Sequence, residues 1–478
     1  MMERRNWIAG RLVDGVRLEA NRNPARPSEV IGHYAWASVE QAEEALGAAR
    51  AALPGWAASN PQTRSDVLRR VGDELNARAE ELGALLTREE GKTLREGIGE
   101  VRRSAQIFHY AAGEPLRQGG EALPGLRDGT TAMVSREPVG VVVLITPWNF
   151  PMAVPAWKTA YALAFGNTVV LKPSEVTPAC AWELADILHR AGLPAGAFNL
   201  VVGDGRTLGP ALVDGADAVS FTGSPGVGRA ILERSVARMT RVQLELGGKN
   251  PLVVHDDADL DLAADIALQG AFHSTGQRCT ATSRIIVDRR VHDAFVERLV
   301  RGMAALRVGD PMDAATDMGP VVSDAQLAKD LRCIADARSE GAELAFGGRR
   351  MDGDGYFLEP TLFVGTNNAM RINRDEVFGP VACVIPADEL DHAIAIANDS
   401  EHALSSGIVT RGLASAETFR RRSRAGLVMV NAPTAGIDYH VPFGGRGPSG
   451  YGGREQGSAA VEFFTDGKTA YINHGIAG

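Results

Sequence analysis

The sequence predicts an α/β fold in which a parallel sheet is followed by a second α/β region. Between residues 139 and 246, short runs rich in Val, Ile and Leu alternate with amphipathic stretches of helix length. Such alternation is typical of βαβ units, whose sheet is covered by helices on both faces. At 478 residues the chain is also too long for one ordinary core, so two or three domains are expected.

The residues before this alternating region are predicted to be mostly helical. A short hairpin is expected over residues 7–15, turned at Asp14-Gly15, and another turn is expected near Asn23-Pro24. Apolar residues then recur at helical spacing in three stretches. These stretches are 38–49, 65–89 and 96–113.

The strands of the alternating region indicate where a ligand would bind. They are predicted at 139–146, 168–172, 198–202, 218–222 and 242–246. Ligands of parallel sheets bind at the carboxyl ends of the strands, so the residues that follow each strand are the first candidates for a site. These residues are 147–150, 172–175, Gly203, 223–228 and 245–248.

Beyond residue 248 the pattern predicts a second set of strands and helices. The strands are expected at 251–254, 284–287 and 381–385, and the helices near 291–306, 324–340, 389–398 and 414–423. A glycine-rich loop at 442–450 precedes the last helix, and residues 465–473 are predicted to form a C-terminal strand.

Composition argues against several classes of function. The formal net charge is −9 and no long basic block balances it, which argues against nucleic acid as a partner. Residues 1–20 lack the apolar core of a signal peptide, and the apolar run 139–145 is too short to span a bilayer, so no membrane partner is expected. The four cysteines lie far apart without a C-x-x-C pair, so we predict no metal site and no disulfide framework, and a cytoplasmic location.

Cys279 is the candidate nucleophile. It lies among glycine, small and hydroxylic residues and directly follows the cation Arg278. A free thiol has a pKa of about 8.5, and a neighbouring guanidinium is expected to lower that pKa and favour the reactive thiolate. The alternative is a cysteine packed in the core as a small hydrophobe. No apolar periodicity runs through residues 274–283, which favours the nucleophile.

Two polar side chains at predicted strand ends could complete such a site. Glu245 is followed by two glycines, so its carboxylate could move and act as a general base toward water. Asn149 lies beside aromatic residues after the first strand, and a side-chain amide is a donor that stabilises an oxyanion. The simpler interpretations are a solvated carboxylate and a turn-forming asparagine.

A glycine-rich turn, GSPGVG at 223–228, follows a predicted strand and precedes a helix expected at 229–236. Backbone amides at such a helix start can hold a pyrophosphate. The glycines are not in the G-x-G-x-x-G order, so a plain tight turn explains them equally well. Glu175, at another strand end, could accept hydrogen bonds from a ribose diol or could simply cap a helix.

Together these residues resemble the NAD(P)-dependent aldehyde dehydrogenase family. Motifs typical of the family occur in its order along nearly the whole chain. They are PWNFP at 147–151, KPSE at 172–175, FTGS at 221–224, ELGGKNP at 245–251, GQRC at 276–279, EVFGP at 376–380 and PFGG at 442–445. The sequence departs from the family pattern at Gly447, where lysine is expected, and at Asp375, which replaces a frequent glutamate.

The resemblance implies a catalytic mechanism. Cys279 would add to an aldehyde, and Asn149 with the Cys279 backbone amide would hold the resulting oxyanion. After hydride transfer to the nicotinamide, Glu245 would activate the water that hydrolyses the thioester. Lys158 matches a lysine that supports the site.

The resemblance also implies the architecture. We expect an aldehyde dehydrogenase-like fold with a Rossmann-type coenzyme domain, an α/β catalytic domain and a small β oligomerisation element, and hence a homodimer or homotetramer. The respective ranges are 1–115 with 139–247, 248–459, and 116–138 with 460–478.

The implied cofactor is NAD, with NADP as the alternative. The residues expected to bind it are Ile145, Thr146, Pro147, Trp148, Lys172, Ser174, Glu175, Gly203, Gly223, Ser224, Gly228, Leu246, Glu376 and Phe378. NAD is favoured because the Glu175 carboxylate would repel a 2′-phosphate, although a rotated carboxylate and Lys172 would admit NADP.

Within the family, residues 276–284 and 434–445 look most like α-ketoglutaric semialdehyde (2,5-dioxopentanoate) dehydrogenases. The residues expected to contact the substrate are Arg103, Phe150, Trp157, Arg278, Ile437 and Phe443. The two arginines would suit a distal carboxylate, unless one makes a surface ion pair and the other only tunes its loop. The apolar side chains would suit an aromatic aldehyde equally well.

Several alternative functions remain open at this point. Within the enzymes they are dehydrogenases of aromatic or aliphatic aldehydes or of succinic semialdehyde, and a CoA-acylating homologue, against which Glu245 argues. A non-catalytic homologue is disfavoured because Cys279, Glu245 and Asn149 are all present. A cysteine hydrolase lacks an arguable His partner.

Overall fold

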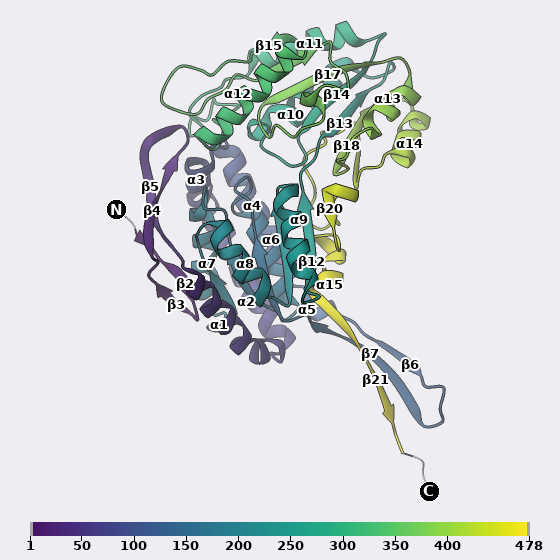
Figure 1. Cartoon of the computed structure of the whole chain (residues 1–478). Coiled ribbons are helices and arrows are strands. Elements are labelled where there is room, and N and C mark those ends of the chain that lie inside the picture. Colours follow the sequence, from purple (N-terminus) through teal and green to yellow (C-terminus); the bar gives the residue numbers. More distant parts are fainter. Residues whose placement is uncertain (1–2, 476–478) are drawn as a thin grey trace.

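The computed structural model describes residues 3–475, and its first large sheet is the lower one in Figure 1. Along this sheet the strand order is β20-β12-β11-β8-β9-β10-β2-β3. Strands β8 to β12 pair in parallel, and β2 and β20 add to them antiparallel. The strands are β2 (Asn6–Ile8), β3 (Arg11–Val13), β8 (Val141–Ile145), β9 (Thr168–Lys172), β10 (Phe198–Leu200), β11 (Ala218–Gly223), β12 (Arg241–Leu246) and β20 (Gly450–Tyr451). The predicted parallel sheet is therefore confirmed.

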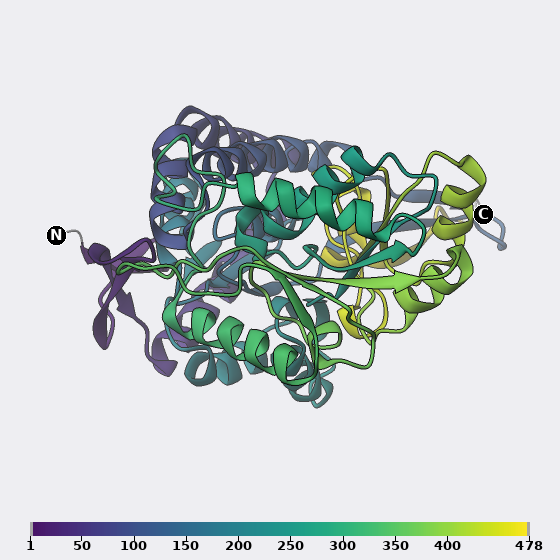
Figure 2. The same cartoon turned by 90° about the horizontal axis from the view of Figure 1, so that it is seen from above.

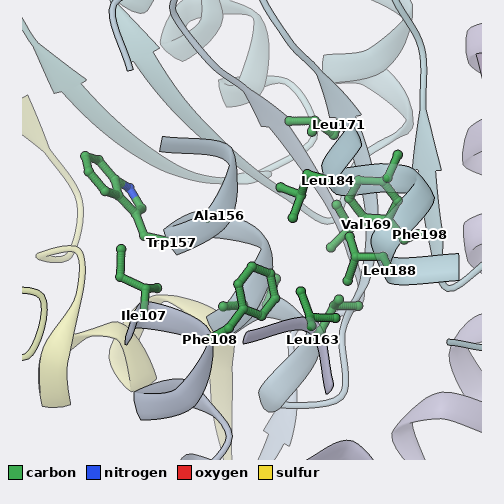
Figure 3. Close-up of a cluster of buried hydrophobic side chains, with 14 of the residues drawn as sticks. Ile107, Phe108, Ala156, Trp157, Leu163, Val169, Leu171, Leu184, Leu188 and Phe198 are labelled. Atoms are coloured by element: carbon green, nitrogen blue, oxygen red, sulfur yellow. The ribbon is translucent and has the colours of Figure 1, made fainter. Parts of the chain in front are cut away.

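Helices cover both faces of this sheet, because alternate strand residues point to opposite sides. Val142 and Leu144 of β8 pack on one set of helices, and Val141 and Val143 pack on the other. The helices are α1 (Val39–Ala57), α2 (Pro61–Ala77), α3 (Ala79–Glu90), α4 (Leu94–Ala111), α5 (Glu114–Arg117), α6 (Ala153–Ala164), α7 (Pro178–Arg190), α8 (Gly205–Gly215) and α9 (Pro225–Val236). In Figure 3, Ile107 and Phe108 of α4 lie beside Trp157 and Leu163 of α6, so these two helices share one core.

Two local predictions are wrong. The region 65–89 is not one helix, because the chain leaves helical geometry at Arg78, which forms ion pairs with Glu81 (2.6 Å) and Glu183 (2.9 Å). The first hairpin turns at Ala9 and Gly10, with φ of 52° and 74°, and not at Asp14-Gly15. A tight two-residue hairpin turn requires such positive φ values, and glycine adopts them at little cost.

The turn expected near Asn23-Pro24 is confirmed, since it joins two paired strands that the sequence pattern did not reveal. These are β4 (Arg17–Asn23) and β5 (Arg26–Trp36), and β5 also pairs with β1 (Glu3–Arg4). In both views these strands lie on the opposite side of the molecule from the arm described below (Figure 1 and Figure 2).

The second large sheet, the upper one in Figure 1, has the order β15-β16-β17-β14-β13-β18-β19, with only β15 antiparallel. Its strands are β13 (Asn250–Val254), β14 (Thr282–Asp288), β15 (Glu343–Phe346), β16 (Thr361–Val364), β17 (Val381–Ala387), β18 (Ser405–Val409) and β19 (Leu427–Val430). Its helices are α10 (Leu260–Phe272), α11 (His292–Ala305), α12 (Asp324–Ser339), α13 (Leu390–Asn398) and α14 (Leu413–Arg422). The sequence analysis did not identify α10, β15, β16, β18 or β19.

A three-stranded antiparallel sheet forms an arm that projects from the body (Figure 1). It consists of β6 (Glu121–Pro124), β7 (Thr130–Pro138) and β21 (Thr465–Asn473), and it joins two segments that are distant in the sequence. The short helix α15 (Ala460–Phe464) precedes β21 and packs in the core beside α6. The division into three domains stays a prediction. Within residues 3–475, none of the helices combines the length and apolar composition needed to cross a bilayer.

Candidate active site

A cavity of about 770 Å³ is lined by residues from both halves of the chain. The first half contributes the ends of β8, β11 and β12, and the second half contributes the loop before β14 and residues before β17. The predicted site residues that line it are Arg103, Pro147, Trp148, Asn149, Phe150, Trp157, Gly223, Ser224, Glu245, Leu246, Arg278, Cys279, Glu376, Phe378, Ile437 and Phe443. Those that do not are Ile145, Thr146, Lys158, Lys172, Ser174, Glu175, Gly203 and Gly228.

The loop before Cys279 is held in a conformation that its residues rarely adopt. A 3₁₀ turn spans His273–Gly276, and within it Ser274 and Thr275 have φ of 51° and 55°. Positive φ values are unfavourable for residues other than glycine, so contacts must hold Ser274 and Thr275 in this conformation. The Glu96 carboxylate of α4 does so by accepting hydrogen bonds from the Ser274 amide (2.7 Å) and hydroxyl (3.0 Å).

Further contacts fix the same loop to the body of the protein. The Thr275 hydroxyl donates to the Gly319 carbonyl at 3.1 Å. The Gln277 side-chain oxygen accepts from the Val322 amide at 2.9 Å. These bonds hold the loop on both sides of Gly276, so the position of Cys279 depends on residues distant in the sequence.

The expectation that Arg278 lowers the pKa of Cys279 is wrong for this state of the protein. Burial, followed by the nearby Glu376 and Glu245 carboxylates, raises the pKa of the Cys279 thiol to about 12. The Arg278 guanidinium attracts the Cys279 thiolate but does not outweigh these effects, and it donates to the main-chain carbonyls of Gln269 and Gly270, near the end of α10. Although Arg278 and Cys279 are adjacent in the sequence, the Arg278 guanidinium forms its hydrogen bonds with α10 and not with the thiol.

Asn149 lies next to the nucleophile loop. Its side-chain nitrogen donates to the Gln277 carbonyl at 3.0 Å, and the residue is 4% exposed. Its own carbonyl accepts a hydrogen bond from the Lys92 ammonium. The side-chain amide is therefore held beside the loop that carries Cys279, as a donor to an oxyanion there would have to be.

Glu245 closes the first-sheet side of the cavity at the end of β12. It is 4% exposed, and its carboxylate accepts a hydrogen bond from the Gly445 amide at 3.2 Å. Burial, and then the charge of Glu455, raise the pKa of Glu245 well above that of an ordinary carboxyl, while Lys158 opposes this shift. A carboxyl with a raised pKa near a nucleophile is suited to proton transfer at neutral pH.

Lys158 is placed behind the cavity and acts on its neighbours rather than on a ligand. Its ammonium donates to the Ser220 hydroxyl at 2.7 Å and pairs with the Glu455 carboxylate. Ser220 in turn donates to the Gln243 side chain at 2.8 Å. Because Lys158 compensates Glu455, it controls the charge that Glu245 experiences.

The glycine-rich turn differs from its prediction in one respect. The helix starts at Pro225, in α9, and not at Arg229, so Gly226 and Gly228 lie in its first turns. Proline at the first helical position is a common helix start. The Ser224 side chain makes no capping bond, and an added Cβ at Gly226 would meet no atom within 4 Å. An open, uncapped helix N-terminus of this kind can accept a phosphate.

Other expected cofactor residues lie at the carboxyl end of β9 and before β17. Lys172 and Glu175 form an ion pair of 2.8 Å. Glu376 accepts a hydrogen bond from the Gly248 amide at 2.9 Å. Phe378, at a positive φ of 68°, meets the Trp148 ring edge-on at a centroid distance of 5.3 Å. These residues offer a diol acceptor and an aromatic wall near the cavity.

The wall of the cavity formed by α4 was not predicted from the sequence, except for Arg103. Residues of and just before α4 line it in two rows with a spacing of four residues. The inner row is Lys92, Glu96 and Glu100, and the arginine row is Arg95, Gly99 and Arg103. The four-residue spacing was visible in the sequence, but charged residues on a helix usually indicate a solvated face. Other lining residues that were missed include His273, Gln326, Lys329 and Gln456.

Comparisons with known proteins agree with this geometry. The model of the aldehyde dehydrogenase family matches residues 14–470 of the chain. The chain is 40% identical over 472 residues to the α-ketoglutaric semialdehyde dehydrogenase of Bacillus subtilis, covering 98% of this chain and 96% of that protein. It is 44% identical over 479 residues to the α-ketoglutarate semialdehyde dehydrogenase of Haloferax volcanii, covering 98% and 99%. A solved structure of Staphylococcus aureus betaine aldehyde dehydrogenase in complex with NAD+ matches with a TM-score of 0.96 at 35% identity, over 99% of this chain and 95% of that one.

Proposed function

The chain belongs to the aldehyde dehydrogenase family and is an oxidoreductase that acts on aldehydes, and we propose that Cys279 is its nucleophile. The proposed reaction converts an acid semialdehyde, such as α-ketoglutaric semialdehyde, and water into a dicarboxylic acid with NAD+ as oxidant. The observation that carries this proposal is the meeting of Cys279, Asn149 and Glu245, from three separate elements, in one cavity.

In the proposed mechanism, the Cys279 thiolate forms a bond to the aldehyde carbon, and the carbonyl oxygen becomes an oxyanion. The Asn149 side-chain amide and the Cys279 backbone amide donate hydrogen bonds to that oxygen. A bound nicotinamide ring supplies the acceptor for the hydride of the former aldehyde carbon. Glu245 then takes a proton from water, which attacks the thioester and releases the acid and the thiol.

The raised pKa of Cys279 is compatible with this role because a bound cofactor can favour the loss of the thiol proton. Burial is its largest cause, and the Glu376 and Glu245 carboxylates contribute. A nearby negative charge disfavours the thiolate, and a positively charged ligand beside the sulfur would favour it. We therefore propose that a bound, oxidised nicotinamide favours the Cys279 thiolate.

We propose NAD as the cofactor, and several features of the chain fit it. The uncapped start of α9, directly after Gly223 and Ser224, offers free amides for a pyrophosphate. Gly228 is also a proposed contact, although its own amide donates to the Ser224 carbonyl at 3.0 Å. Glu175, with its side chain 37% exposed and paired with Lys172, offers acceptors for a ribose diol. The remaining proposed contacts are Ile145, Thr146, Pro147, Trp148, Ser174, Gly203, Leu246, Glu376 and Phe378.

Glu175 also supports a preference for NAD over NADP. Its carboxylate would repel a 2′-phosphate, although the Lys172 ammonium offsets part of that charge. Replacing Glu175 with Ser should raise kcat/KM for NADP relative to NAD. A wild-type protein that strongly prefers NADP would contradict this assignment.

The proposed substrate class rests on relatives and on the chemistry of the cavity. Relatives named for α-ketoglutaric semialdehyde share 40% and 44% identity with nearly the whole chain. Phe150, Trp157, Ile437 and Phe443 line the cavity as apolar walls, with the cations Arg103 and Arg278 also in its lining. An aliphatic chain with a carboxylate at its far end matches such a combination.

The presence of Glu245 supports hydrolysis rather than transfer of the thioester to CoA, because hydrolysis requires a base for water. We further propose a homo-oligomer, since the arm exposes large apolar side chains that a second copy could cover. They are Leu123, Leu126, Met133, Tyr471 and Ile472. A cytoplasmic location is proposed on the similarity to the relatives named above.

Steady-state NADH formation with a panel of aldehydes tests the proposal. Wild-type protein should oxidise semialdehydes, and Cys279→Ala should abolish the activity with every aldehyde. Cys333→Ala is the matched control, because Cys333 is a free, half-buried cysteine on α12 that does not line the cavity. Activity that survives in Cys279→Ala would contradict the assignment of the nucleophile.

A further inference from the structure

The arginine row of α4 carries two guanidinium groups without partners along the cavity. Arg95 and Arg103 are two helical turns apart, about 12 Å along the helix axis. Among the hydrogen bonds and ion pairs of residues 3–475, neither side chain has a partner, and the Nε of Arg103 is buried. Arg103 is half-buried and Arg95 is exposed. A half-buried cation without a partner is costly, so Arg103 in particular favours an anionic ligand.

The charges around Arg103 do not neutralise it. The carboxylate of Glu100, one turn earlier on α4, already accepts hydrogen bonds from the Lys92 ammonium (2.9 Å) and from the amides of Met152 (3.1 Å) and Ala153 (3.0 Å). Asp438 is the other carboxylate that influences Arg103, but it is exposed and forms no bond to it. The guanidinium therefore keeps its donors free for the cavity.

Two other arginines near the cavity are engaged elsewhere. Arg278 donates through Nη2 to the carbonyls of Gln269 and Gly270, and its Nε is buried. Arg102, the neighbour of Arg103, is exposed, pairs with Glu80 at 3.9 Å and does not line the cavity. Of Arg102, Arg103 and Arg278, only Arg103 combines a place in the lining with a full set of free donors.

The row is also open to a ligand. An added Cβ at Gly99 would meet no atom within 4 Å, so the surface between the two arginines is unobstructed. The opposite side of α4 is fixed in the core by Ile107 and Phe108, which lie beside Trp157 and Leu163 (Figure 3). A helix packed in the core fixes the backbone positions of both arginines, so that their side chains can reach the same part of the cavity.

We propose that Arg103 binds the distal carboxylate of the substrate, that Arg95 attracts it at the cavity mouth, and that Arg278 serves only to hold the nucleophile loop. This assignment rests on the proposed acid-semialdehyde function and identifies the residue that gives its specificity. It implies a preference of anionic over neutral aldehydes and of neutral over cationic ones, such as betaine aldehyde.

The test compares kcat/KM of the full-length enzyme for succinic semialdehyde, pentanal and betaine aldehyde. Arg103→Met should lower the value for the anionic aldehyde about 10- to 100-fold, which corresponds to a lost charge-assisted hydrogen bond. The value for pentanal should stay unchanged and that for betaine aldehyde should rise. Arg103→Lys should recover part of the loss, because it keeps the charge without the planar fork.

Three further variants complete the set. Arg102→Met is the matched control and should change nothing. Arg95→Met should lower kcat/KM for the anion about 2- to 5-fold at low ionic strength, an effect that salt abolishes. Arg278→Met should lower kcat for all three aldehydes alike, because it loosens the loop that carries the nucleophile.

Two outcomes would overturn the proposal: equal losses with all aldehydes in Arg103→Met, which indicate a structural role, or no loss with any. Binding of glutarate, a five-carbon dicarboxylate, separates this inference from the proposed function. If wild-type protein oxidises no aldehyde but glutarate raises its Tm only while Arg103 is present, the reaction is wrong and the carboxylate site stands. If that Tm shift persists in Arg103→Met, the carboxylate site is refuted.

Discussion

The inner row and the arginine row lie along the same wall of the cavity, yet they differ in whether their charges have protein partners. In the inner row, Lys92 bonds to Glu100 and to the Asn149 carbonyl, and Glu96 bonds to Ser274. In the arginine row, Arg95 and Arg103 have no such partners among residues 3–475.

The difference separates two uses of charge in one site. Partnered charges fix the groups that react, because each bond restricts the position of the Asn149 amide or of the Cys279 loop. Charges without partners remain available to a ligand. Changes in the inner row should therefore affect all aldehydes equally, and changes in the arginine row should affect only charged ones.

The largest expected effect follows the loss of Lys92, the cation of the inner row. Burial opposes the charged form of Lys92, but Glu100 and Glu90 outweigh it and raise the pKa of Lys92. Lys92→Met leaves both carboxylates buried without their cation, which should lower the free energy of unfolding by about 3–5 kcal/mol. The midpoint of denaturant unfolding measures this loss.

Glu90 sharpens this prediction. Burial already raises the pKa of Glu90 to about 8, with Lys92 acting against the shift. Without Lys92 this pKa should rise further, so the variant should lose most stability at high pH, where a buried Glu90 would have to ionise. A loss of less than about 1 kcal/mol would show that the inner row is not a stabilising network.

The next effect concerns the tether of the nucleophile loop. One carboxylate oxygen of Glu96 binds Ser274, and the other accepts bonds from the Thr93 amide (3.1 Å) and hydroxyl (2.9 Å). Glu96→Ala should lower kcat about 10- to 100-fold for anionic and neutral aldehydes alike, with little change in KM, because the loop no longer holds Cys279 in place.

A matched control separates the tether from the helix cap. Thr93→Ala removes the capping box of α4 but leaves the bonds from Glu96 to Ser274. It should cost about 1 kcal/mol of stability and leave kcat unchanged. Equal kcat losses in the two variants would mean that the cap, and not the tether, positions the loop.

A smaller effect is expected on the pH dependence of the hydrolysis step. Burial and then Glu455 raise the pKa of Glu245, and a base must lose its proton, so hydrolysis should slow as pH falls through that raised pKa. Glu455→Gln removes the like charge and should move this acid limb to lower pH. Lys158→Met removes the opposing cation and should move it to higher pH.

The pre-steady-state burst of NADH reports the steps that precede hydrolysis. Comparing the burst with the steady-state rate therefore isolates the hydrolysis step. At a fixed pH on the acid limb, each variant should change the steady-state rate by up to about 10-fold, which corresponds to one pKa unit. Shifts of the same sign in both variants would contradict the proposed role of Glu455 and Lys158.

The sequence alone predicted the reacting groups better than the groups that hold them. Cys279, Glu245 and Asn149 follow strand ends or lie in a polar loop, and these are local signals. The inner row was missed because its bonds join residues far apart, such as Glu96 with Ser274, 178 positions later. The direction of Arg278 was also not predictable, since its position beside Cys279 fixes the backbone and not the side chain.

Some helix boundaries were not predicted either, because they also depend on contacts between residues far apart in the sequence. The break at Arg78 has no glycine or proline and depends on ion pairs with Glu183 on another helix. The start of α9, in contrast, was signalled by Pro225, which we placed in a turn. Local chemistry therefore predicted elements and reactive side chains, whereas long-range pairing decided where helices end and which charges are free.

The smallest expected effect is a gain of stability in the arginine row. A Cβ at Gly99 would meet no atom within 4 Å, so Gly99→Ala should raise the free energy of unfolding by about 0.5–1 kcal/mol through helix propensity and leave kcat/KM unchanged. Gly97→Ala, two residues earlier, is the matched control. Its Cβ would lie 2.6 Å from the Gly83 carbonyl oxygen, so it should destabilise the contact between α3 and α4. If Gly99→Ala lowered kcat/KM for the anionic aldehyde, the open surface between Arg95 and Arg103 would be in direct contact with substrate.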